Sequence, residues 1–303
     1  VVPKRAKSLS VMIAELQRIA AHLIWLGPHA LDIGAMTLLL YNFREREDIL
    51  RVFEEVAGGR LTPTYLRIGG VSKDLPDNGI EEKVKAFVQA FPDHIKEYET
   101  LLTKNIIWLK RTKGVGVISK EDAISFGVTG PTLRGSGVKY DVRKAYPYSS
   151  YDEFDFEIPI GSVGDVYDRY IVRLREMEWS NAIVEQALER LPKGPVLANE
   201  PRITLPPKED VMRDIAALIR QFKIVSEGFQ PPKGEVYASV EASKGELGFY
   251  IVSDGSNRPY RFRIRTPSFA NLSAFPKMIE GGLIADVISV IGSIDIVLGE
   301  IDR

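Results

Sequence analysis

Residues 22–41 form an almost continuous apolar run, which constrains the fold more than any other stretch; they read HLIWLGPHALDIGAMTLLLY. A run of this kind must be buried in a protein core or in lipid. A buried carboxylate is costly unless it is paired or protonated, yet Asp32 stands in the middle of the run. Pro28, two histidines and Asp32 would be expensive inside a membrane, so the sequence favours a pair of buried core helices.

Asp32 is open to two interpretations from its neighbours alone. His29 lies three residues earlier on the same helical face, so a local pair would make Asp32 a structural carboxylate. Alternatively, Asp32 orients an ionisable group in a pocket, where groups with shifted pKa values gather. The residues themselves do not decide between these two roles.

Composition excludes several kinds of site. The chain has 303 residues with 40 Lys and Arg against 41 Asp and Glu, so no overall charge attracts nucleic acid or an anionic membrane. It has no cysteine, which excludes disulfides, thiolate zinc sites and iron–sulfur ligands of its own. Three scattered histidines do not indicate a metal site. We expect the chain to bind no metal, no cluster and no nucleic acid.

Hydrophobic periodicity predicts five long helices. They cover residues 9–26, 28–56, 80–102, 164–191 and 208–227. Gly27 and Pro28 separate the first two, since proline suits the first position of a helix. Ser119 and Asp122 resemble a capping box that opens a short helix. Residues 130–162 have no strong periodicity and are predicted to be a long irregular connection with short extended pieces, a feature that is often functional.

Alternation with period two begins after residue 228 and predicts a small antiparallel sheet. The strands are GEVYASVEA, GELGFYIVSDG and PYRFRIRT, with a turn at 254–257 between the last two. A final helix near 283–292 and the tail SIDIVLGEIDR complete the chain.

We therefore predict an α+β fold, a helix-rich bundle with a small antiparallel β module. Residues 1–303 are expected to form one domain, with its N-terminal part lying outside this sequence, which opens VVPKRAKSLS without Met. Residues 1–228 are mostly helical, and residues 229–303 supply the β module, the final helix and the tail.

Two sets of side chains have plain structural explanations. Arg261, Arg263 and Arg265 share one strand face, which is either solvated or a docking face for a partner. Met12 and Met36 are typical of residues that fill irregular space in a core.

Seven stretches, in this order, resemble the quinone-site subunit of respiratory complex I, the 49-kDa or D subunit of NADH:quinone oxidoreductase. They are HALDIGAMT, REREDILRVFEEVAG, YLRIGGVSKDLP, LRGSGVKYDVRKAYPY, GDVYDRYIVRLREM, KGEVYASVEASKGELGFYIVSDGSNRPYR and IGSIDIVLGEIDR. The resemblance spans the whole chain and implies a fold similar to the large subunit of nickel–iron hydrogenases.

The resemblance implies that an ancestral metal site has become a pocket for a quinone headgroup. The hydrogenase tail pattern is Asp-Pro-Cys-x-x-Cys-x-x-His, and Val297, Glu300 and Arg303 fall at its two cysteine positions and its histidine position. No thiolate remains to hold nickel. Lys244 falls at the arginine position of a second hydrogenase motif. The quinone-binding residues implied are Met36, Lys244, Asp295, Val297 and Arg303.

The resemblance also gives Asp32 a catalytic role. In the family, the aspartate of this motif hydrogen-bonds a histidine of an N-terminal His-Pro-x-x-His-Gly loop, and that histidine and a tyrosine contact the quinone. Both segments lie outside this sequence. Thr62 stands where many members carry a histidine near the terminal iron–sulfur cluster, which puts that histidine's role in doubt here.

The resemblance implies a subunit of the peripheral arm that couples quinone reduction to proton translocation and is inactive when isolated. It also implies that NADH, FMN and iron–sulfur clusters belong to partner subunits. The expected partners are the small iron–sulfur subunit, a 30-kDa-type subunit and the quinone-channel subunit of the membrane arm. The expected location is the cytoplasmic face of a bacterial inner membrane, or the matrix side in mitochondria. Two alternatives remain: a hydrogenase-type subunit of a related membrane complex, and a non-catalytic scaffold of the same fold.

Overall fold

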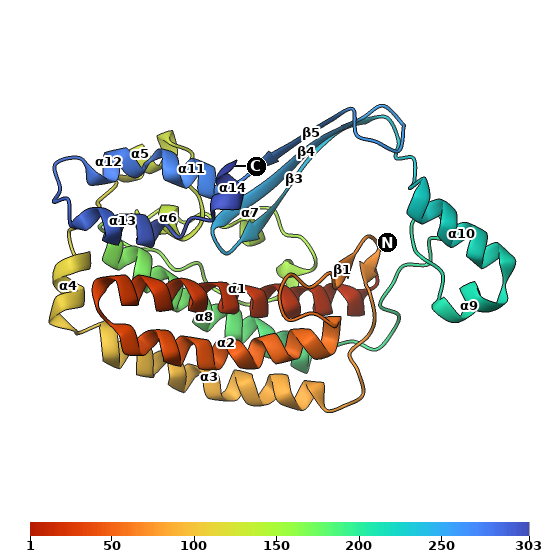
Figure 1. Cartoon of the computed structure of the whole chain (residues 1–303), viewed down its shortest axis with the longest axis horizontal. Helices are drawn as coiled ribbons and strands as arrows, with labels where there is room; N and C mark the ends of the chain where they lie inside the picture. The colour runs from red at the N-terminus through yellow and green to blue at the C-terminus, as the bar shows by residue number, and fades with distance from the viewer. Residues whose placement is uncertain (303) are drawn as a thin grey trace.

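Four long helices form the body of the protein in the computed structural model, which describes residues 1–302 (Figure 1). They are α1 (Lys4–Ile33), α2 (Met36–Ala57), α3 (Ile80–Leu102) and α8 (Val166–Glu189). α1 packs against α2 and α8, and α3 packs against the same two helices. The main hydrophobic core lies between them and includes Leu9, Met12, Leu16, Phe53, Phe91 and Tyr170. The predicted helices at residues 80–102 and 164–191 are thereby confirmed.

The break between α1 and α2 is not where the sequence predicted it. α1 continues through Pro28 to Ile33 and ends at Gly34, whose φ of 110° is a conformation that L side chains rarely adopt. Gly27 is a point of close packing, because a Cβ there would lie 2.9 Å from Leu39 Cδ1. The predicted helix end at Gly27 is wrong because this glycine allows close contact between α1 and α2 and does not form a turn.

Burial along these helices corrects two further predictions. Met12 is fully buried, as expected of a core residue, whereas Met36 is 67% exposed and does not fill the core. Ile24, which belongs to the apolar run at 22–41 that was expected to be buried, is also exposed. α1 is long and apolar enough to cross a membrane, but 72% of its most apolar window is buried inside the protein. This burial agrees with the interpretation of α1 as a core helix.

Short elements connect the long helices. They are β1 (Leu66–Arg67), β2 (Gly70–Val71), α4 (Ile106–Thr112), α5 (Lys120–Ser125), α6 (Gly130–Gly135), α7 (Val142–Ala145) and the 3-10 turn η1 (Tyr151–Glu153). Ser119 caps α5 as predicted, since its Oγ accepts the N–H of Asp122 at 3.0 Å. The connection at 130–162 contains helical turns where extended pieces were expected.

An arm of the protein carries α9 (Lys208–Arg213), α10 (Ile215–Ser226) and a three-stranded sheet. The predicted helix at 208–227 is divided because the Asp214 side chain accepts the N–H groups of Ala216 and Ala217 and so starts α10 afresh. The strands are β3 (Gly234–Ala242), β4 (Gly245–Ser253) and β5 (Arg261–Arg265), antiparallel in the order β3-β4-β5. This sheet confirms the predicted α+β class.

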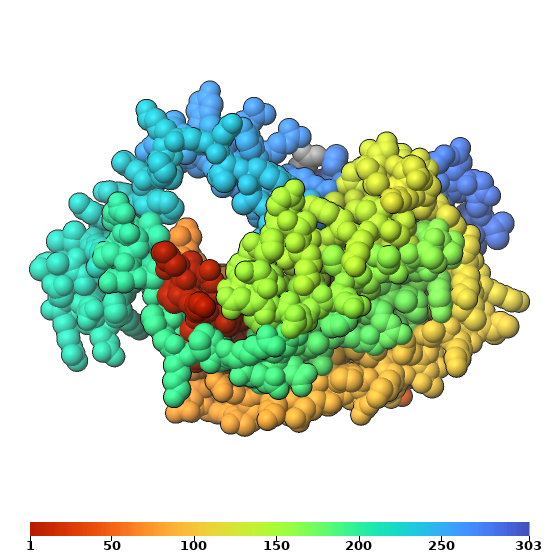
Figure 2. Space-filling view, turned by 180° about the vertical axis from the view of Figure 1, so that it is seen from behind, coloured from red at the N-terminus to blue at the C-terminus, as the bar shows by residue number. Residues whose placement is uncertain are grey.

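The sheet reaches the body of the protein at the β3–β4 turn and at Arg265, the last residue of β5, which donates to the carbonyl oxygen of Gly127, and its other end extends toward α9 and α10 (Figure 1). Seen from behind, the strands, the α9–α10 region and the N-terminus surround an opening (Figure 2). Four short helices follow β5, and the first of them packs against β4 (Figure 1). They are α11 (Pro267–Ser273), α12 (Phe275–Ile279), α13 (Asp286–Ile294) and α14 (Leu298–Asp302).

A buried network of charged side chains holds the connection at 130–162 against the bundle. Glu15 of α1 accepts hydrogen bonds from Arg143 at 3.0 Å, Tyr151 at 2.5 Å and Ser180 at 2.7 Å. Arg143 also pairs with Asp141 at 2.7 Å. The Arg143, Arg18 and hydroxyl partners outweigh the effect of burial and lower the pKa of Glu15 to about 2.

Arg134 forms the second half of this network. Its guanidinium lies 2.6 Å from Glu176 of α8 and 2.9 Å from Glu241 of β3, and all three side chains are fully buried. Glu176 Oε2 lies 3.0 Å from Nε2 of His22 on α1. The network therefore joins α1, α8, β3 and the irregular connection through charges that have no access to water.

Arg143→Met should destabilise the protein strongly, because it leaves Glu15 and Asp141 buried without their main cation. We expect a loss of about 3–5 kcal/mol in the free energy of unfolding, measured by chemical denaturation. Arg175→Met is the matched control: its ion pairs with Glu99 and Glu178 involve a side chain that is 43% exposed. The control should lose about 1 kcal/mol or less, and equal losses in the two variants would contradict the structural role of the network.

Acid should remove the contribution that the ionised Glu15 carboxylate makes to the free energy of unfolding. Its folded pKa of about 2 lies below the ordinary value of 4.5, so its stabilisation is present above pH 4.5 and disappears as the pH falls toward 2. The free energies of unfolding of the wild type and of Glu15→Gln should therefore converge over this interval. Denaturation curves collected at several pH values test this, and a constant difference between the two proteins would refute it.

Candidate functional site

The β3–β4 turn brings Lys244 to the C-terminal tail. Lys244 Nζ lies 2.5 Å from Asp295 Oδ2, and both side chains are 10% exposed. These two residues are 51 positions apart in the sequence and come from a hairpin turn and from the end of α13. The pair is the closest association that the structure shows among the predicted site residues.

Two neighbouring elements hold this turn in place. Arg18 of α1 donates to the carbonyl oxygens of Glu241 at 2.6 Å and Ala242 at 3.1 Å. Asn271 of α11 donates to the carbonyl oxygen of Lys244 at 3.1 Å. A Cβ at Gly130 would come within 2.6 Å of that same oxygen, so only glycine permits the approach of α6. The placement of Lys244 thus depends on buried groups of the bundle.

Asp295 occupies an unusual backbone position at the end of α13. Its φ is 58°, in the left-handed region that few residues other than glycine adopt. Burial raises the pKa of Asp295, while Lys244 and Arg173 act in the opposite direction. The net increase favours the protonated carboxyl more than an exposed aspartate would.

Two buried arginines of α8 lie behind the tail. Arg173 donates to the carbonyl oxygen of Ile294 at 3.4 Å, and its guanidinium lies 4.2 Å from the ring centre of Trp25. Arg169 is held by Ser293 Oγ at 2.9 Å and by backbone carbonyls. Burial lowers the pKa of both arginines. Their positive charge faces the segment that carries Asp295.

Glu300 anchors the tail and does not project freely into the site. Its Oε2 accepts a hydrogen bond from Ser268 Oγ at 2.5 Å, and its carbonyl oxygen accepts one from Thr266 at 2.7 Å. Ser268 Oγ also accepts the N–H of Val297 at 3.3 Å. The Val297 side chain remains 42% exposed beside this anchor. Arg303, the last predicted site residue, lies outside the described residues.

Asp32 and Met36 lie apart from this pair, at the corner between α1 and α2. Both are exposed, which contradicts the expectation that Asp32 is buried in this chain. Within residues 1–302, no hydrogen bond or ion pair joins either side chain to Lys244 or Asp295. Asp32 lies on the exposed side of the apolar run, next to exposed Leu31 and two residues before Gly34, at which α1 ends.

His29 is not the partner of Asp32. Its ring is buried between Trp25 and Trp108, with ring centres 5.3 and 5.4 Å away, and neither ring nitrogen has a hydrogen-bond partner in the described part of the chain. Burial lowers the pKa of His29 to about 3, so the ring is neutral at physiological pH. The local-pair interpretation of Asp32 is therefore wrong.

Sequence reasoning missed the residues that support the site. Arg18, Arg173, Ser268 and Asn271 were not identified, although α1 and α8 carried a usable signal. Ionisable residues recur there at helical spacing within apolar stretches, at positions 15, 18 and 22 and at positions 169, 173 and 176. Charges repeated on the apolar face of two helices predict that the helices face each other across buried ion pairs.

Within residues 1–302, no group of three or more His, Cys, Asp or Glu side chains could hold a metal ion. The Lys244–Asp295 pair offers one ammonium and one carboxylate, and the apolar residue Val297 follows Asp295 two positions later in the chain. This set can donate and accept hydrogen bonds and exchange protons, and it lacks the soft ligands that nickel or an iron–sulfur cluster requires.

Known proteins resemble this chain over nearly its whole length. Residues 32–303 match the family described as respiratory-chain NADH dehydrogenase, 49 Kd subunit. The D subunit of NADH-quinone oxidoreductase from Geotalea uraniireducens is 58% identical over 302 residues, which cover 100% of this chain and 77% of the relative. The corresponding D 2 subunit from Thermodesulfovibrio yellowstonii is 54% identical over 99% of this chain and 76% of its own length.

A third relative has a longer polypeptide. The C/D 2 subunit of NADH-quinone oxidoreductase from Aquifex aeolicus is 54% identical over the whole of this chain, which corresponds to 52% of the relative. These identities far exceed what is needed to establish common descent. The chain belongs to the family of 49-kDa subunits of the respiratory-chain NADH dehydrogenase, which includes these D subunits.

Proposed function

We propose that this chain forms the headgroup pocket for a quinone in an NADH:quinone oxidoreductase, together with a small iron–sulfur subunit. The observation that carries the proposal is the nearly buried pair of Lys244 and Asp295, two positions along the chain from exposed Val297, in a member of the 49-kDa subunit family. A pocket with apolar walls and a few convergent polar groups is typical of sites that bind small aromatic molecules.

Reduction of a quinone to a quinol adds two electrons and two protons. In the proposed reaction, NADH supplies the electrons through FMN and iron–sulfur clusters of partner subunits, and they reach the quinone from the small iron–sulfur subunit. This chain handles hydrogen bonds and protons. Lys244 Nζ can donate to a quinone carbonyl oxygen, and Asp295, whose pKa is raised, can hold a proton beside it.

Asp32 has a complementary role in this proposal. It is exposed at the α1–α2 corner and pairs with no cation in residues 1–302, so it is available to a group brought by another segment. The family resemblance indicates a histidine from an upstream loop. A carboxylate next to a histidine stabilises the protonated ring, which can then deliver a proton to the reduced quinone.

The surface around the same corner supports a docking role. Exposed apolar side chains gather on α1, α2 and α4; they are Leu31, Met36, Leu40, Ile106 and Ile107. Apolar surface on this scale is typical of protein interfaces. We propose that the quinone-channel subunit of the membrane arm covers it, which places this chain in the peripheral arm at the cytoplasmic face of a bacterial membrane or its mitochondrial equivalent.

We base the proposed further partners, and the proposed coupling of quinone reduction to proton translocation, on the membership of the chain in this family. The C/D designation of the Aquifex aeolicus relative supports a close association with a C-type subunit, which we take to be the 30-kDa-type partner. The isolated chain is expected to be inactive, because its electrons come from partners, and quinone reduction in the complex is expected to drive proton translocation. The absence of cysteine in the sequence argues against the hydrogenase alternative.

The variant Asp32→Asn distinguishes a catalytic role of Asp32 in quinone reduction from the alternative that the chain is a non-catalytic scaffold. The variant keeps the shape of the side chain and loses its charge, so we expect the complex to assemble while quinone reduction falls by at least about tenfold. Oxidation of NADH by an artificial acceptor upstream of the quinone should persist. Asp77→Asn, at another exposed aspartate, should behave as the wild type. Normal quinone turnover in assembled Asp32→Asn would support the scaffold.

Val297→Met tests whether the tail lines the pocket. A longer side chain there would fill space for the headgroup, so the quinone KM should rise and inhibitor sensitivity should change while assembly remains intact. Leu298→Met is the matched control, because Leu298 is 71% exposed and starts α14 directly after Val297. If both variants show wild-type quinone kinetics and inhibitor response, Val297 lies outside the pocket.

A further inference from the structure

The three-stranded sheet has two chemically different faces. Side chains along each strand alternate between the faces of a sheet, and the strand register decides which of them lie together. The rows Val236–Ile251–Phe262, Ala238–Phe249–Ile264 and Val240–Leu247 fall on one face, so these three rows are entirely apolar, and Ser253 lies on the same face at its distal end. The opposite face carries Glu235, Tyr237, Tyr250, Arg261 and Arg263.

The apolar face is open to solvent. Its members Val236 and Phe262 are 55% and 50% exposed, and Val240 and Ile264 are 36% and 37% exposed. Single exposed apolar residues are common on proteins, but a whole sheet face of them marks a contact surface. This surface belongs neither to the Lys244–Asp295 site nor to the α1–α2 corner.

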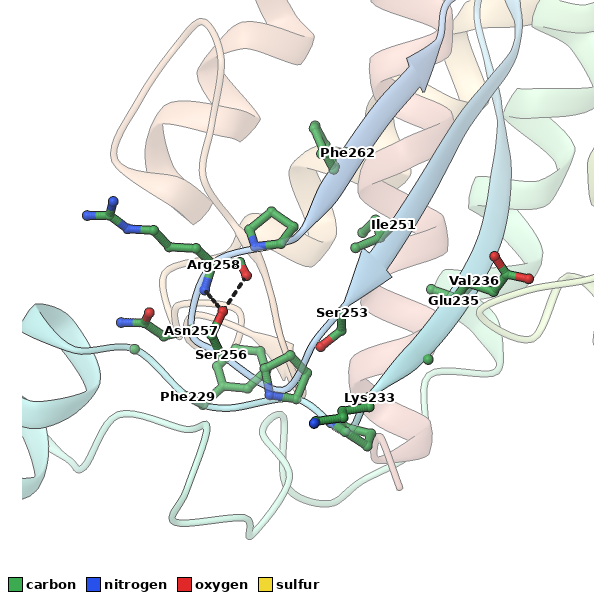
Figure 3. Close-up of a pocket in the computed structure, with 15 residues that line it drawn as sticks. Phe229, Lys233, Glu235, Val236, Ile251, Ser253, Ser256, Asn257, Arg258 and Phe262 are labelled. Carbon is green, nitrogen blue, oxygen red and sulfur yellow. Dashed lines mark hydrogen bonds between the residues drawn. The ribbon is translucent and has the colours of Figure 1, made fainter.

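The apolar face continues into a hollow at the distal end of the sheet. The hollow has a volume of about 640 Å³ and is lined by Val236, Ile251, Phe262 and the connection at 228–232 (Figure 3). The same connection forms one wall of a second hollow, of about 950 Å³, that is also lined by Ile219 and Ile224 of α10. An occupant could therefore extend from the sheet to α10.

The distal part of the outer edge of β3 is unpaired within the described residues. β3 is an edge strand, and residues 234–238 are all exposed. Within residues 1–302, its backbone groups on that side meet a partner only near the bundle, at Glu241 and Ala242. The edge strand β5 carries Arg261 and Arg263, which discourage pairing, whereas the exposed part of β3 has no Lys or Arg after Gly234. β3 is thus the edge that can accept another strand.

We propose that a segment of this same polypeptide, upstream of Val1, covers the apolar sheet face and pairs with the outer edge of β3. The N-terminus lies beside the opening that the sheet and the α9–α10 region surround, so a preceding segment enters it directly (Figures 1 and 2). The relatives are long enough to contain such a segment, because the whole of this chain corresponds to only 77% of the Geotalea uraniireducens protein.

The geometry favours this occupant over a separate protein. The α9–α10 region closes one side of the opening, which suits a threaded segment better than the flat approach of a globular partner. The tail at the other end of the chain is held at α11 by Thr266 and Ser268 and lies away from the hollow. A permanent cover also explains why the face has no charged side chain, because a face that is repeatedly exposed would promote aggregation.

Cysteine labelling can test this proposal, because the 303-residue sequence contains no cysteine. Val236→Cys and Ile264→Cys place a thiol on the apolar face, and Tyr237→Cys and Arg263→Cys place one on the opposite face as matched controls. Each variant is made in the full-length protein and treated with a maleimide, both in isolation and in the assembled complex. Peptide mass spectrometry then locates the label.

In the isolated full-length protein, the apolar-face thiols should react at least about tenfold more slowly than the controls, because labelling then requires local opening. Equal rates on the two faces would overturn the proposal. Protection that appears only in the assembled complex would also overturn it, by assigning the cover to a partner. Hydrogen exchange on the unmodified full-length protein gives an independent check: residues 234–240 should be protected, and rapid exchange throughout β3 would count against strand pairing.

Discussion

The buried ion network around Glu15 and Arg134 is the interaction on which the rest of the structure depends. Removing charges from water costs free energy that is recovered only when every partner is in place, so the network tolerates one arrangement of its elements. It fixes a connection that has little secondary structure of its own. Through Arg18, which pairs with Glu15 and also holds the carbonyls before Lys244, it extends to the β3–β4 turn. The geometry of the candidate site is therefore set in the core of the bundle.

The candidate site consists of a closed part and an open part. Lys244 and Asp295 are paired and nearly buried, so their geometry is complete in this chain. Asp32 and Met36 are exposed at the α1–α2 corner, beside apolar side chains that have no cover within residues 1–302. Under the proposed function, the closed part binds the headgroup, and other segments or subunits complete the open part. This division accounts for the expectation that the isolated chain is inactive.

Periodicity in the sequence predicted the long helices and the sheet, because each buries a regular stripe of its own. It failed where tertiary contact decides the outcome. Gly27 and Pro28 suggest a helix end, but Gly27 serves the contact with Leu39 and the helix continues. The turns at 130–162 lack a stripe and are held by charges from distant helices. For the site, the association of Lys244 with Asp295 was implied only by the family resemblance, since spacing along the chain cannot show contact between residues 51 positions apart. The quinone-binding roles themselves stay predictions.

The resemblance to the hydrogenase tail pattern implies that Val297 and Glu300 replace two thiolates. Neither residue supplies the chemistry of a thiolate. Valine has no lone pair, and the Glu300 carboxylate accepts a hydrogen bond from Ser268 and so serves the backbone of the tail. What remains near the end of α13 is one buried ion pair and an apolar surface. Under the proposed function, the Lys244 ammonium donates a hydrogen bond to a carbonyl oxygen of the quinone headgroup, whereas a soft metal ion would require sulfur ligands, which the tail SIDIVLGEIDR lacks.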